Sequence, residues 1–351
     1  MSKRELNQRQ KIILEILAKE GSANTASIVA AVEEVASKTI VRDLNLLQDL
    51  GLIKKSGQAK ATSYSLLPLY KLTNDIDKEE YFQLEPDDRE IENKFNLSIF
   101  SDLEVSSDNI FTKSELDQIK SLTKTYQANR SELSRATIKK EFERLTIELA
   151  WKSSKIEGNT YSLLDTETLL KSGIVSPGHS EEERLMLLNH KHSLNYIFDN
   201  PKYYKDLSLN NLTELHSLIV DQLEIGKQIR TRLVGITGTN YQPLDNEFQI
   251  KEALLKTCKL INQCSDPMVK SLYASALLAY IQAFEDGNKR TSRIVTNALL
   301  IAYDYCPLSY RSIDIGEYKK AVLLFYEQNN IRYLKELLIE QYEFAVDHYF
   351  C

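Results

Sequence analysis

The feature that most constrains this chain is a pair of helical stretches separated by a short polar turn. Residues 272–280 have the composition of an apolar helix, Glu285-Asp286-Gly287 interrupts it, and a second helix is predicted to begin near Asn288. Gly287 permits a tight turn at this point, and Asn288 is a good capping residue. The sequence has only 11 glycines and 7 prolines in 351 residues, which favours helix over sheet. We therefore expect a mainly helical protein.

The start of the second predicted helix combines several features of an anion-binding site. Its first backbone N–H groups have no partner within the helix, so they attract negative charge. Lys289, Arg290 and Arg293 add three cations near this helix end, where the helix dipole disfavours them. Such an arrangement indicates a bound anion, and a triphosphate with a metal ion on Asp286 would satisfy the whole set. The alternative is a capped helix whose arginines face solvent.

Composition argues against several classes of protein. The net charge of −6 is unsuited to a protein that coats nucleic acid along its whole length. No segment approaches the roughly 18 apolar residues of a membrane span, and residues 1–10 lack the apolar core of a signal peptide. The four cysteines show no CxxC spacing, which disfavours a disulfide framework and a zinc cluster. We expect a cytoplasmic protein with no membrane partner.

Residues 1–67 predict a small winged helix-turn-helix domain. Apolar residues at helical spacing indicate a helix over residues 9–19, a short second helix around residues 28–32, and a third that ends at Gly51. Two short strands that turn at Ser56-Gly57 follow. Three helices followed by a strand ribbon are typical of this domain.

The exposed face of the third predicted helix carries the candidate DNA contacts. Lys38, Thr39 and Arg42 lie opposite its apolar stripe, and an arginine there can contact base edges. The small basic excess of this domain leaves two interpretations open, namely binding of duplex DNA and a protein-interaction or dimerisation module. The candidate phosphate contacts in the strand ribbon are Lys54, Lys55 and Lys60.

The rest of the chain has two regions of different character. Residues 68–112 include a strongly acidic stretch that could serve as a linker or as a helical support. Residues 113–351 are predicted to be helical almost throughout. The exception is residues 230–244, whose β-branched residues and glycines predict a short exposed hairpin. Because this hairpin has no sheet to join, we expect it to contact a ligand or a peptide.

Three motifs of this chain resemble those of the Fic family. Residues 282–293 read QAFEDGNKRTSR and are similar to the family signature HxFx(D/E)GN(G/K)RxxR. Residues 153–158, SSKIEG, resemble the inhibitory helix motif (S/T)xxxE(G/N), and the predicted hairpin around Thr237, Gly238 and Thr239 resembles the flap that positions a target segment. The resemblance spans roughly residues 145–350 and implies a Fic-type helical bundle with one β-hairpin flap, within residues 113–351 and behind the winged helix.

The resemblance also implies a chemistry. Most Fic enzymes transfer AMP from ATP to a hydroxyl of a target protein, with Mg²⁺ bridging the phosphates. In the inhibited state a glutamate of the inhibitory motif occupies the arginine that otherwise binds the γ-phosphate, and a charge-assisted Arg–carboxylate pair makes this competition reasonable. The residues implied are Asp286 for Mg²⁺; Gly287, Asn288, Lys289, Arg290 and Arg293 for the nucleotide; and Ser153, Glu157 and Gly158 for inhibition.

One position departs from the family signature. The catalytic histidine, which serves as general base, aligns with Gln282. A glutamine side chain can form a hydrogen bond to a hydroxyl but has no nitrogen that accepts its proton near neutral pH. Loss of a general base costs on the order of 10²–10⁴ in rate, so we expect AMP transfer to be impaired. The other histidines considered as replacements are predicted to be packing or surface residues: His179, His190, His192 and His216.

Three functions remain open at this point. The first is a Fic adenylyltransferase of weak activity that Glu157 inhibits. The second is a pseudoenzyme in which nucleotide binding controls DNA binding by the winged helix. The third is Glu157-dependent removal of AMP from a target protein. The implied partners are an unidentified target protein, duplex DNA through residues 1–67, and a second copy of the chain in a homodimer.

Overall fold

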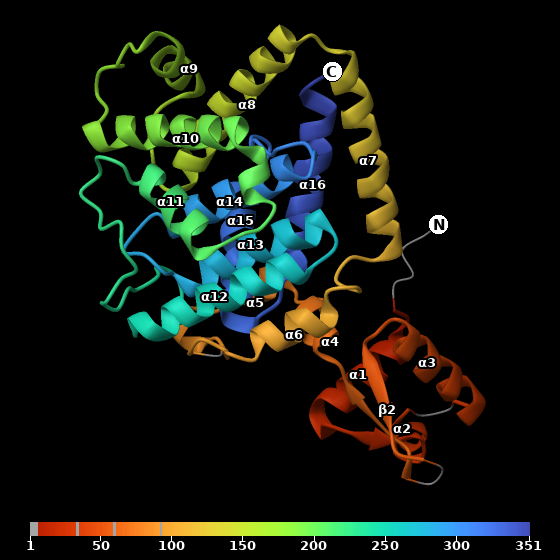
Figure 1. Cartoon of the computed structure of the whole chain (residues 1–351). Coiled ribbons are helices and arrows are strands. Elements are labelled where there is room, and N and C mark those ends of the chain that lie inside the picture. Colours follow the sequence, from red (N-terminus) through yellow and green to blue (C-terminus); the bar gives the residue numbers. More distant parts are fainter. Residues whose placement is uncertain (1–5, 33–34, 59–60, 92) are drawn as a thin grey trace. The chain divides into compact units, whose positions relative to one another are not determined.

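The computed structural model describes residues 6–32, 35–58, 61–91 and 93–351, which form two compact units (Figure 1). The smaller unit takes residues 1–75 and 98–114, and the larger unit takes residues 76–97 and 115–351. The chain therefore leaves the smaller unit, returns to it, and leaves it again. Lys60, one of the candidate phosphate contacts, lies outside the described residues.

The smaller unit is the predicted winged helix-turn-helix. Three residues of the predicted apolar stripe of the third helix are buried in one core with Ile13 and Ile28, namely Ile40, Leu44 and Leu47. The fourth, Val41, is exposed, because it lies one position round the helix from the buried face. The three strands pair antiparallel in the order β1-β3-β2, and β1 is a short strand that the sequence did not indicate. The elements of this unit are α1 (Gln8–Glu20), β1 (Ala23–Asn24), α2 (Thr25–Ala31), α3 (Ser37–Asp49), β2 (Ile53–Ser56), β3 (Ser63–Leu66), α4 (Pro68–Thr73) and α6 (Ile99–Ser106).

The larger unit is helical, so the predicted fold class is confirmed. It comprises α5 (Lys78–Tyr81), η2 (Pro86–Asp88), nearly all of α7 (Lys113–Glu132), α8 (Arg135–Ile156), α9 (Leu163–Ser172), α10 (Glu181–Asp199), η3 (Pro201–Tyr204), α11 (Leu209–Ile219), α12 (Glu247–Gln263), α13 (Pro267–Ile281), α14 (Asn288–Ala302), α15 (Ile315–Gln328) and α16 (Arg332–His348).

Helices α13 and α14 occupy the centre of this unit (Figure 1). All residues of α13 except Pro267 and Ser275 are buried, as expected for a helix that is apolar on every side. The two helices pack against each other, and α14 also contacts α10 and α11. The polar turn that joins them is thereby held between packed helices.

Residues 230–244 form the segment that we call the flap. The prediction that they form a β-hairpin is wrong in one respect. Neither arm of the flap is a strand, and within the described residues its only ladder contact is a single parallel bridge between Gln242 and Lys94. The physical reason lies at its base, where the buried guanidinium of Arg230 donates to the carbonyls of Arg232 and Leu244. These carbonyls are bound to a side chain instead of to an opposite strand.

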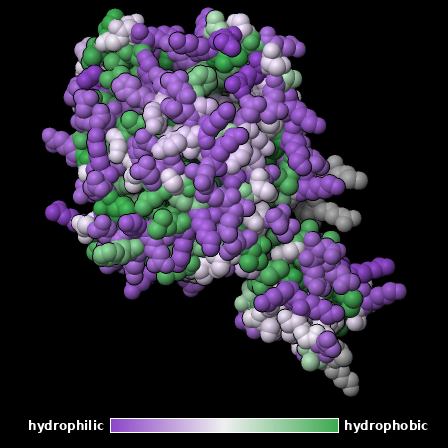
Figure 2. Space-filling view, viewed as in Figure 1, coloured by the Kyte–Doolittle hydropathy of each residue, from purple (hydrophilic) through white to green (hydrophobic). Residues whose placement is uncertain are grey.

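Hydrophilic side chains cover most of the face seen in Figure 2, with scattered apolar residues between them. Single exposed apolar residues are normal on a protein surface. In the part of the chain that the structure describes, no helix has the length and apolar character needed to span a membrane.

Candidate functional site

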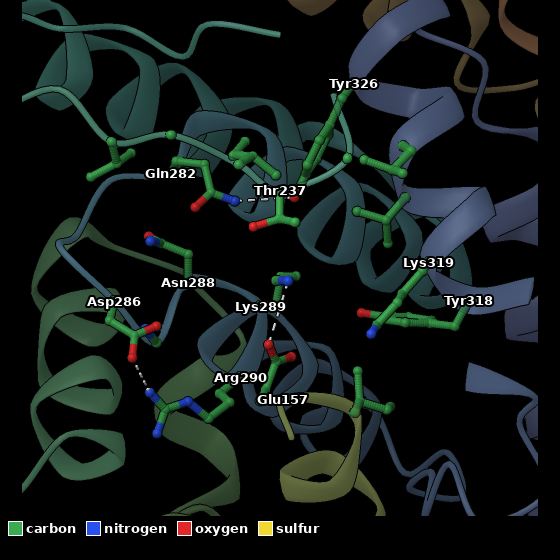
Figure 3. A pocket seen from close by; sticks show the side chains of 18 of the residues that line it. Glu157, Thr237, Gln282, Asp286, Asn288, Lys289, Arg290, Tyr318, Lys319 and Tyr326 are labelled. Carbon is green, nitrogen blue, oxygen red and sulfur yellow. Dashed lines mark hydrogen bonds and ion pairs between the residues drawn. The ribbon is translucent and has the colours of Figure 1, made fainter. Parts of the chain in front are cut away.

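The three motifs meet around one cavity of about 470 Å³ in the larger unit (Figure 3). Its walls come from the end of α8, the flap, the turn between α13 and α14, and one face of α15. Residues far apart in the sequence therefore face a common space. The lining residues include Glu157, Thr237, Gly238, Gln282, Asp286, Gly287, Asn288, Lys289, Arg290, Tyr318, Lys319 and Tyr326.

The turn between α13 and α14 is held by contacts within the motif itself. The Asn288 side chain accepts from the Phe284 backbone N–H at 2.9 Å and donates to the Phe284 carbonyl at 2.8 Å. Gly287 has φ +78°, and a Cβ atom there would lie 3.0 Å from Val220, so a side chain would strain the backbone and crowd Val220. The residue that caps α14 is Gly287, and Asn288 is its first helical residue.

Gln282 offers the cavity a hydrogen-bond acceptor. Its Nε2 donates to the Ala279 carbonyl at 2.6 Å and to the Tyr326 hydroxyl at 3.1 Å, which uses both amide hydrogens. The Ala279 carbonyl fixes this orientation, because a flipped amide would place two oxygens against each other. Figure 3 shows the remaining oxygen on the side of the cavity where Asp286 lies. This oxygen can orient a hydroxyl but does not titrate.

Asp286 and Arg290 pair with each other on the side of the turn away from Gln282 (Figure 3). The Asp286 carboxylate accepts from the Gly287 backbone N–H at 2.5 Å and from Arg290 Nη2 at 2.9 Å. The Arg290 side chain is only 3% exposed, and its Nη1 is buried without a partner among the described residues. A buried, unsatisfied cationic donor costs free energy, so an anion here would stabilise the site.

The structure brings Glu157 and Arg293 together as the family resemblance implies. Arg293 Nη2 donates to Glu157 Oε1 at 2.7 Å, and Lys289 Nζ lies 3.4 Å from Glu157 Oε2. Burial raises the pKa of Glu157, but the charges of Arg293, Lys289 and Arg290 outweigh it and lower the pKa to about 2. Glu157 is thus a carboxylate held by two cations. Lys289, expected to bind the nucleotide, is engaged by this carboxylate.

A buried chain of hydrogen bonds through Ser153 and His190 holds the Arg293 side chain. Arg293 Nε donates to Ser153 Oγ at 2.8 Å, and Ser153 Oγ lies 2.8 Å from His190 Nε2. His190 Nδ1 lies 2.8 Å from the Met186 carbonyl, so Nδ1 carries the proton and Nε2 accepts from the serine. Burial lowers the pKa of His190 to about 3, which keeps the ring neutral.

This role of His190 was missed from the sequence, because Ser153 and His190 are 37 residues apart and no motif links them. His179, His190, His192 and His216 all lie outside the lining of the cavity. His216 stacks on Phe284 with ring centroids 3.6 Å apart, and its Nε2 lies 3.0 Å from the Asp286 carbonyl. Burial lowers its pKa to about 4, so it supports the turn as a neutral ring.

In the smaller unit, the candidate DNA contacts lie on the surface. Lys38, Arg42, Lys54 and Lys55 are exposed, and Thr39 is half-buried. The acidic residue next to Arg42, Asp43, is buried and bound by Arg9 and Gln10, so it does not face the same side.

Comparison with known proteins identifies one known domain in each of the two parts of the chain. Residues 206–300 match the Fic/DOC family, and residues 9–62 match the DeoR-like helix-turn-helix domain. The protein adenylyltransferase fic-1 of Caenorhabditis briggsae is 30% identical over 162 residues, which are 44% of this chain and 31% of that protein. The protein adenylyltransferase Fic of Culex quinquefasciatus is 28% identical over 179 residues, 49% of this chain and 35% of that protein. The chain thus matches about a third of the length of these relatives.

Solved structures share the fold of the larger unit. Fic-1 (residues 134–508) of Caenorhabditis elegans aligns with a TM-score of 0.58 at 19% identity, over 72% of this chain and 80% of that one. A Fic domain containing signaling protein from Bacteroides thetaiotaomicron aligns with a TM-score of 0.56 at 21% identity, over 66% of this chain and 96% of that one.

Proposed function

Because the chain carries a Fic/DOC domain and a DeoR-like helix-turn-helix domain, we propose that it is an ATP-binding protein of the Fic adenylyltransferase type, inhibited by its own Glu157 and slowed by Gln282. The observation that carries this proposal is the Glu157–Arg293 pair at the edge of the cavity that the signature motif lines. The remaining elements of the site fit a nucleotide in the same place.

The groups at the start of α14 suit the phosphates of ATP. The backbone N–H groups of the first helical turn and the unpartnered Nη1 of Arg290 are donors for phosphate oxygens. Mg²⁺ is usually held by one or two carboxylates together with substrate phosphates, and the Asp286 carboxylate, 61% exposed, fits that mode. Bound there, Mg²⁺ would supply charge neutralisation at the phosphate oxygens.

Inhibition follows from competition for Arg293. The guanidinium of Arg293 is fully buried and already bound by Glu157, Ser153 and Tyr318, so a γ-phosphate must displace Glu157 to reach it. The Glu157 charge also repels phosphate. While Glu157 stays in place, the phosphates are not held for in-line attack on the α-phosphorus.

Gln282 limits the chemical step without removing the binding site. Its oxygen can accept a hydrogen bond from the attacking hydroxyl of a target protein, but the proton has no base to go to at this position. Removal of AMP with Glu157 as base is the weaker alternative, because a carboxylate whose pKa is about 2 binds protons poorly.

A calorimetric titration of Mg-ATP tests the inhibitory pair. The parent protein is compared with Glu157→Gly and with Glu182→Gly, a control that removes an exposed carboxylate outside the cavity. We expect Glu157→Gly to tighten binding by about tenfold or more, because the loss of about 1.4 kcal/mol of competing interaction gives that factor. Equal affinities of all three proteins, or no binding to any, would contradict the proposal.

A second function, binding of duplex DNA, is supported by the exposed basic residues of α3 and of β2. We therefore propose two partners in the cytoplasm. One is a target protein that carries the modified hydroxyl, and the other is duplex DNA. The homodimer stays a prediction. In the double variant Lys38→Glu with Arg42→Glu, we expect weaker duplex binding and a salt dependence reduced by about 2 in slope.

The matched control for DNA binding is Lys139→Glu with Lys140→Glu, two exposed lysines of α8 in the larger unit. The measurement is fluorescence anisotropy of a labelled duplex at several salt concentrations. If both double variants bind alike, the smaller unit is an interaction module and not a DNA reader.

A further inference from the structure

The flap is supported by residues 76–91 and 93–97, which we call the strap. The strap belongs to the larger unit and lies along α15, to which Tyr81 donates a hydrogen bond at Glu327, 2.7 Å away. The Gln328 side chain donates to the Glu90 carbonyl at 2.5 Å. Near its end, the backbone N–H of Asn96 donates to the Tyr280 hydroxyl at 2.9 Å.

Arg89 is the most buried charged contact of the strap. Its side chain is 5% exposed and pairs with Glu327, 1% exposed, through bonds of 2.9 and 3.1 Å from Nη1 to both carboxylate oxygens. The guanidinium also lies 5.2 Å from the ring centroid of Phe82. A buried and doubly bonded arginine is held in one orientation, because each alternative would leave a buried charge without its partner.

In this orientation Arg89 reaches the tip of the flap. Its Nη2 donates to the Gly238 carbonyl at 3.1 Å, and Gly238 lines the cavity. Two further contacts follow along the second arm of the flap. Asn240 Nδ2 donates to Asp87 Oδ1 at 2.7 Å, and the Gln242 backbone N–H donates to the Asn93 carbonyl at 2.7 Å. The strap therefore holds the flap at its tip and along one arm.

Beyond the Arg230 contacts at its base, the flap lacks the strand pairing that would support a hairpin from within. Its arms do not pair with each other in the described residues, and residues 231–233, 235, 237 and 238 are exposed. A loop without ladder bonds opens at low free-energy cost unless other groups hold it. The contacts from Arg89, Asp87 and Asn93 are of that kind.

We propose that Arg89 is a positioning residue that sets the place of the flap over the cavity. It acts on the site through the Gly238 carbonyl and touches neither the nucleotide groups nor Gln282. Loss of the contact frees the flap tip and widens the cavity. The effect on nucleotide affinity rests on the function proposed above, whereas the effect on flap mobility does not.

The test uses Arg89→Lys, which keeps a positive charge beside Glu327 but cannot bind Glu327 and Gly238 together through a rigid fork. Asn240→Ala is the second variant, because Asn240 is exposed and its replacement leaves no buried charge unpaired. The control is Arg184→Lys, whose arginine pairs with Glu181 on the surface of α10. The readouts are deuterium exchange of residues 233–242, trypsin cleavage after the exposed Arg232, and the Tm.

We expect flap exchange and cleavage to rise by about tenfold in Arg89→Lys and by less in Asn240→Ala, while exchange in α14 stays as in the parent. A flap as protected in both variants as in the parent would overturn the proposal. A rise in exchange throughout the larger unit of both variants would also overturn it, because Arg89 would then be a general stability residue.

Measurement of Mg-ATP affinity distinguishes failure of the positioning role of Arg89 from failure of the proposed nucleotide-binding function. In the Glu157→Gly background, we expect Arg89→Lys to weaken Mg-ATP binding several-fold. If no variant binds Mg-ATP but the flap still loosens, the positioning role stands and the proposed function fails. If ATP binds and the flap does not loosen, the positioning role fails alone.

Discussion

Two of the walls of the cavity, the α13–α14 turn and the flap, are built in different ways. The α13–α14 turn is closed by bonds between residues four apart, Asn288 to Phe284 and Arg290 to Asp286. The flap is fixed by partners about 150 residues away, Arg89 at Gly238 and Asp87 at Asn240. A wall of the first kind is specified by a short motif and is recognisable from it. A wall of the second kind depends on the whole fold, so its residues can change without altering any local pattern.

The largest expected effect lies at the locally built wall. In a Glu157→Gly background, Gln282→His should raise AMP transfer from α-labelled ATP by about 10²–10⁴, because it supplies the missing base to a site that is otherwise intact. The measurement is label incorporation into protein, with Gln282→Asn as the control of similar polarity. An unchanged rate would mean that the residues of the turn are not sufficient for AMP transfer. The difference between the two walls would then have no consequence for activity.

The second prediction compares the same wall with the surface. Asn288→Ala removes the partners of the Phe284 N–H and carbonyl, both buried, and should lower the free energy of unfolding by about 2–4 kcal/mol. Asn210→Ala, at an exposed position of α11, should change it by less than about 0.5 kcal/mol. Urea unfolding of both variants measures the difference. Equal losses would show that the turn does not depend on its local bonds.

The third prediction concerns the distant support behind the locally built wall. The pKa of His190 is lowered to about 3 in the folded state, so the unfolded chain binds a proton that the folded chain does not as the pH falls below about 6.5. The contribution of His190 to the free energy of unfolding is therefore fully present above about pH 6.5 and is lost as the pH falls toward 3. The contribution of His190 to this decline approaches about 1.4 kcal/mol per pH unit.

The check is the pH dependence of the free energy of unfolding between pH 7 and 4.5. His190→Gln should have a shallower slope than the parent, whereas His192→Gln, at an exposed position of the same helix, should keep the parent slope. Identical slopes for all three proteins would contradict the neutral state of the buried His190 ring, on which its contact with Ser153 behind Arg293 depends.

The smallest expected effect lies in the flap. Thr239 Oγ1 accepts from the Tyr241 backbone N–H at 3.1 Å, a local bond within the flap. Thr239→Ala should destabilise the protein by about 0.5–1 kcal/mol at most, and Thr239→Ser should restore the parent value. A loss as large as that of Asn288→Ala would show that the flap, too, is held mainly from within.

The extent of what the sequence could predict follows the same division. The helical class, the winged helix, the helix break at residues 285–287 and the Glu157–Arg293 pairing all rest on local patterns or on a short motif. The flap was predicted as a hairpin because its composition suits strands, but propensity does not report whether a partner strand exists. The roles of Arg230, His190 and Arg89 depend on contacts that no spacing in the sequence encodes.

The path of the chain bears on how this protein can be divided. Residues 76–97 belong to the larger unit, although the segments on both sides of them, residues 1–75 and 98–114, belong to the smaller one. No single cut therefore separates the two units. A truncation that starts at residue 115 removes the strap together with the winged helix, and grafting another N-terminal domain requires that residues 76–97 be kept as an insert. Along the sequence, the two units are interleaved and do not follow one another as separate segments.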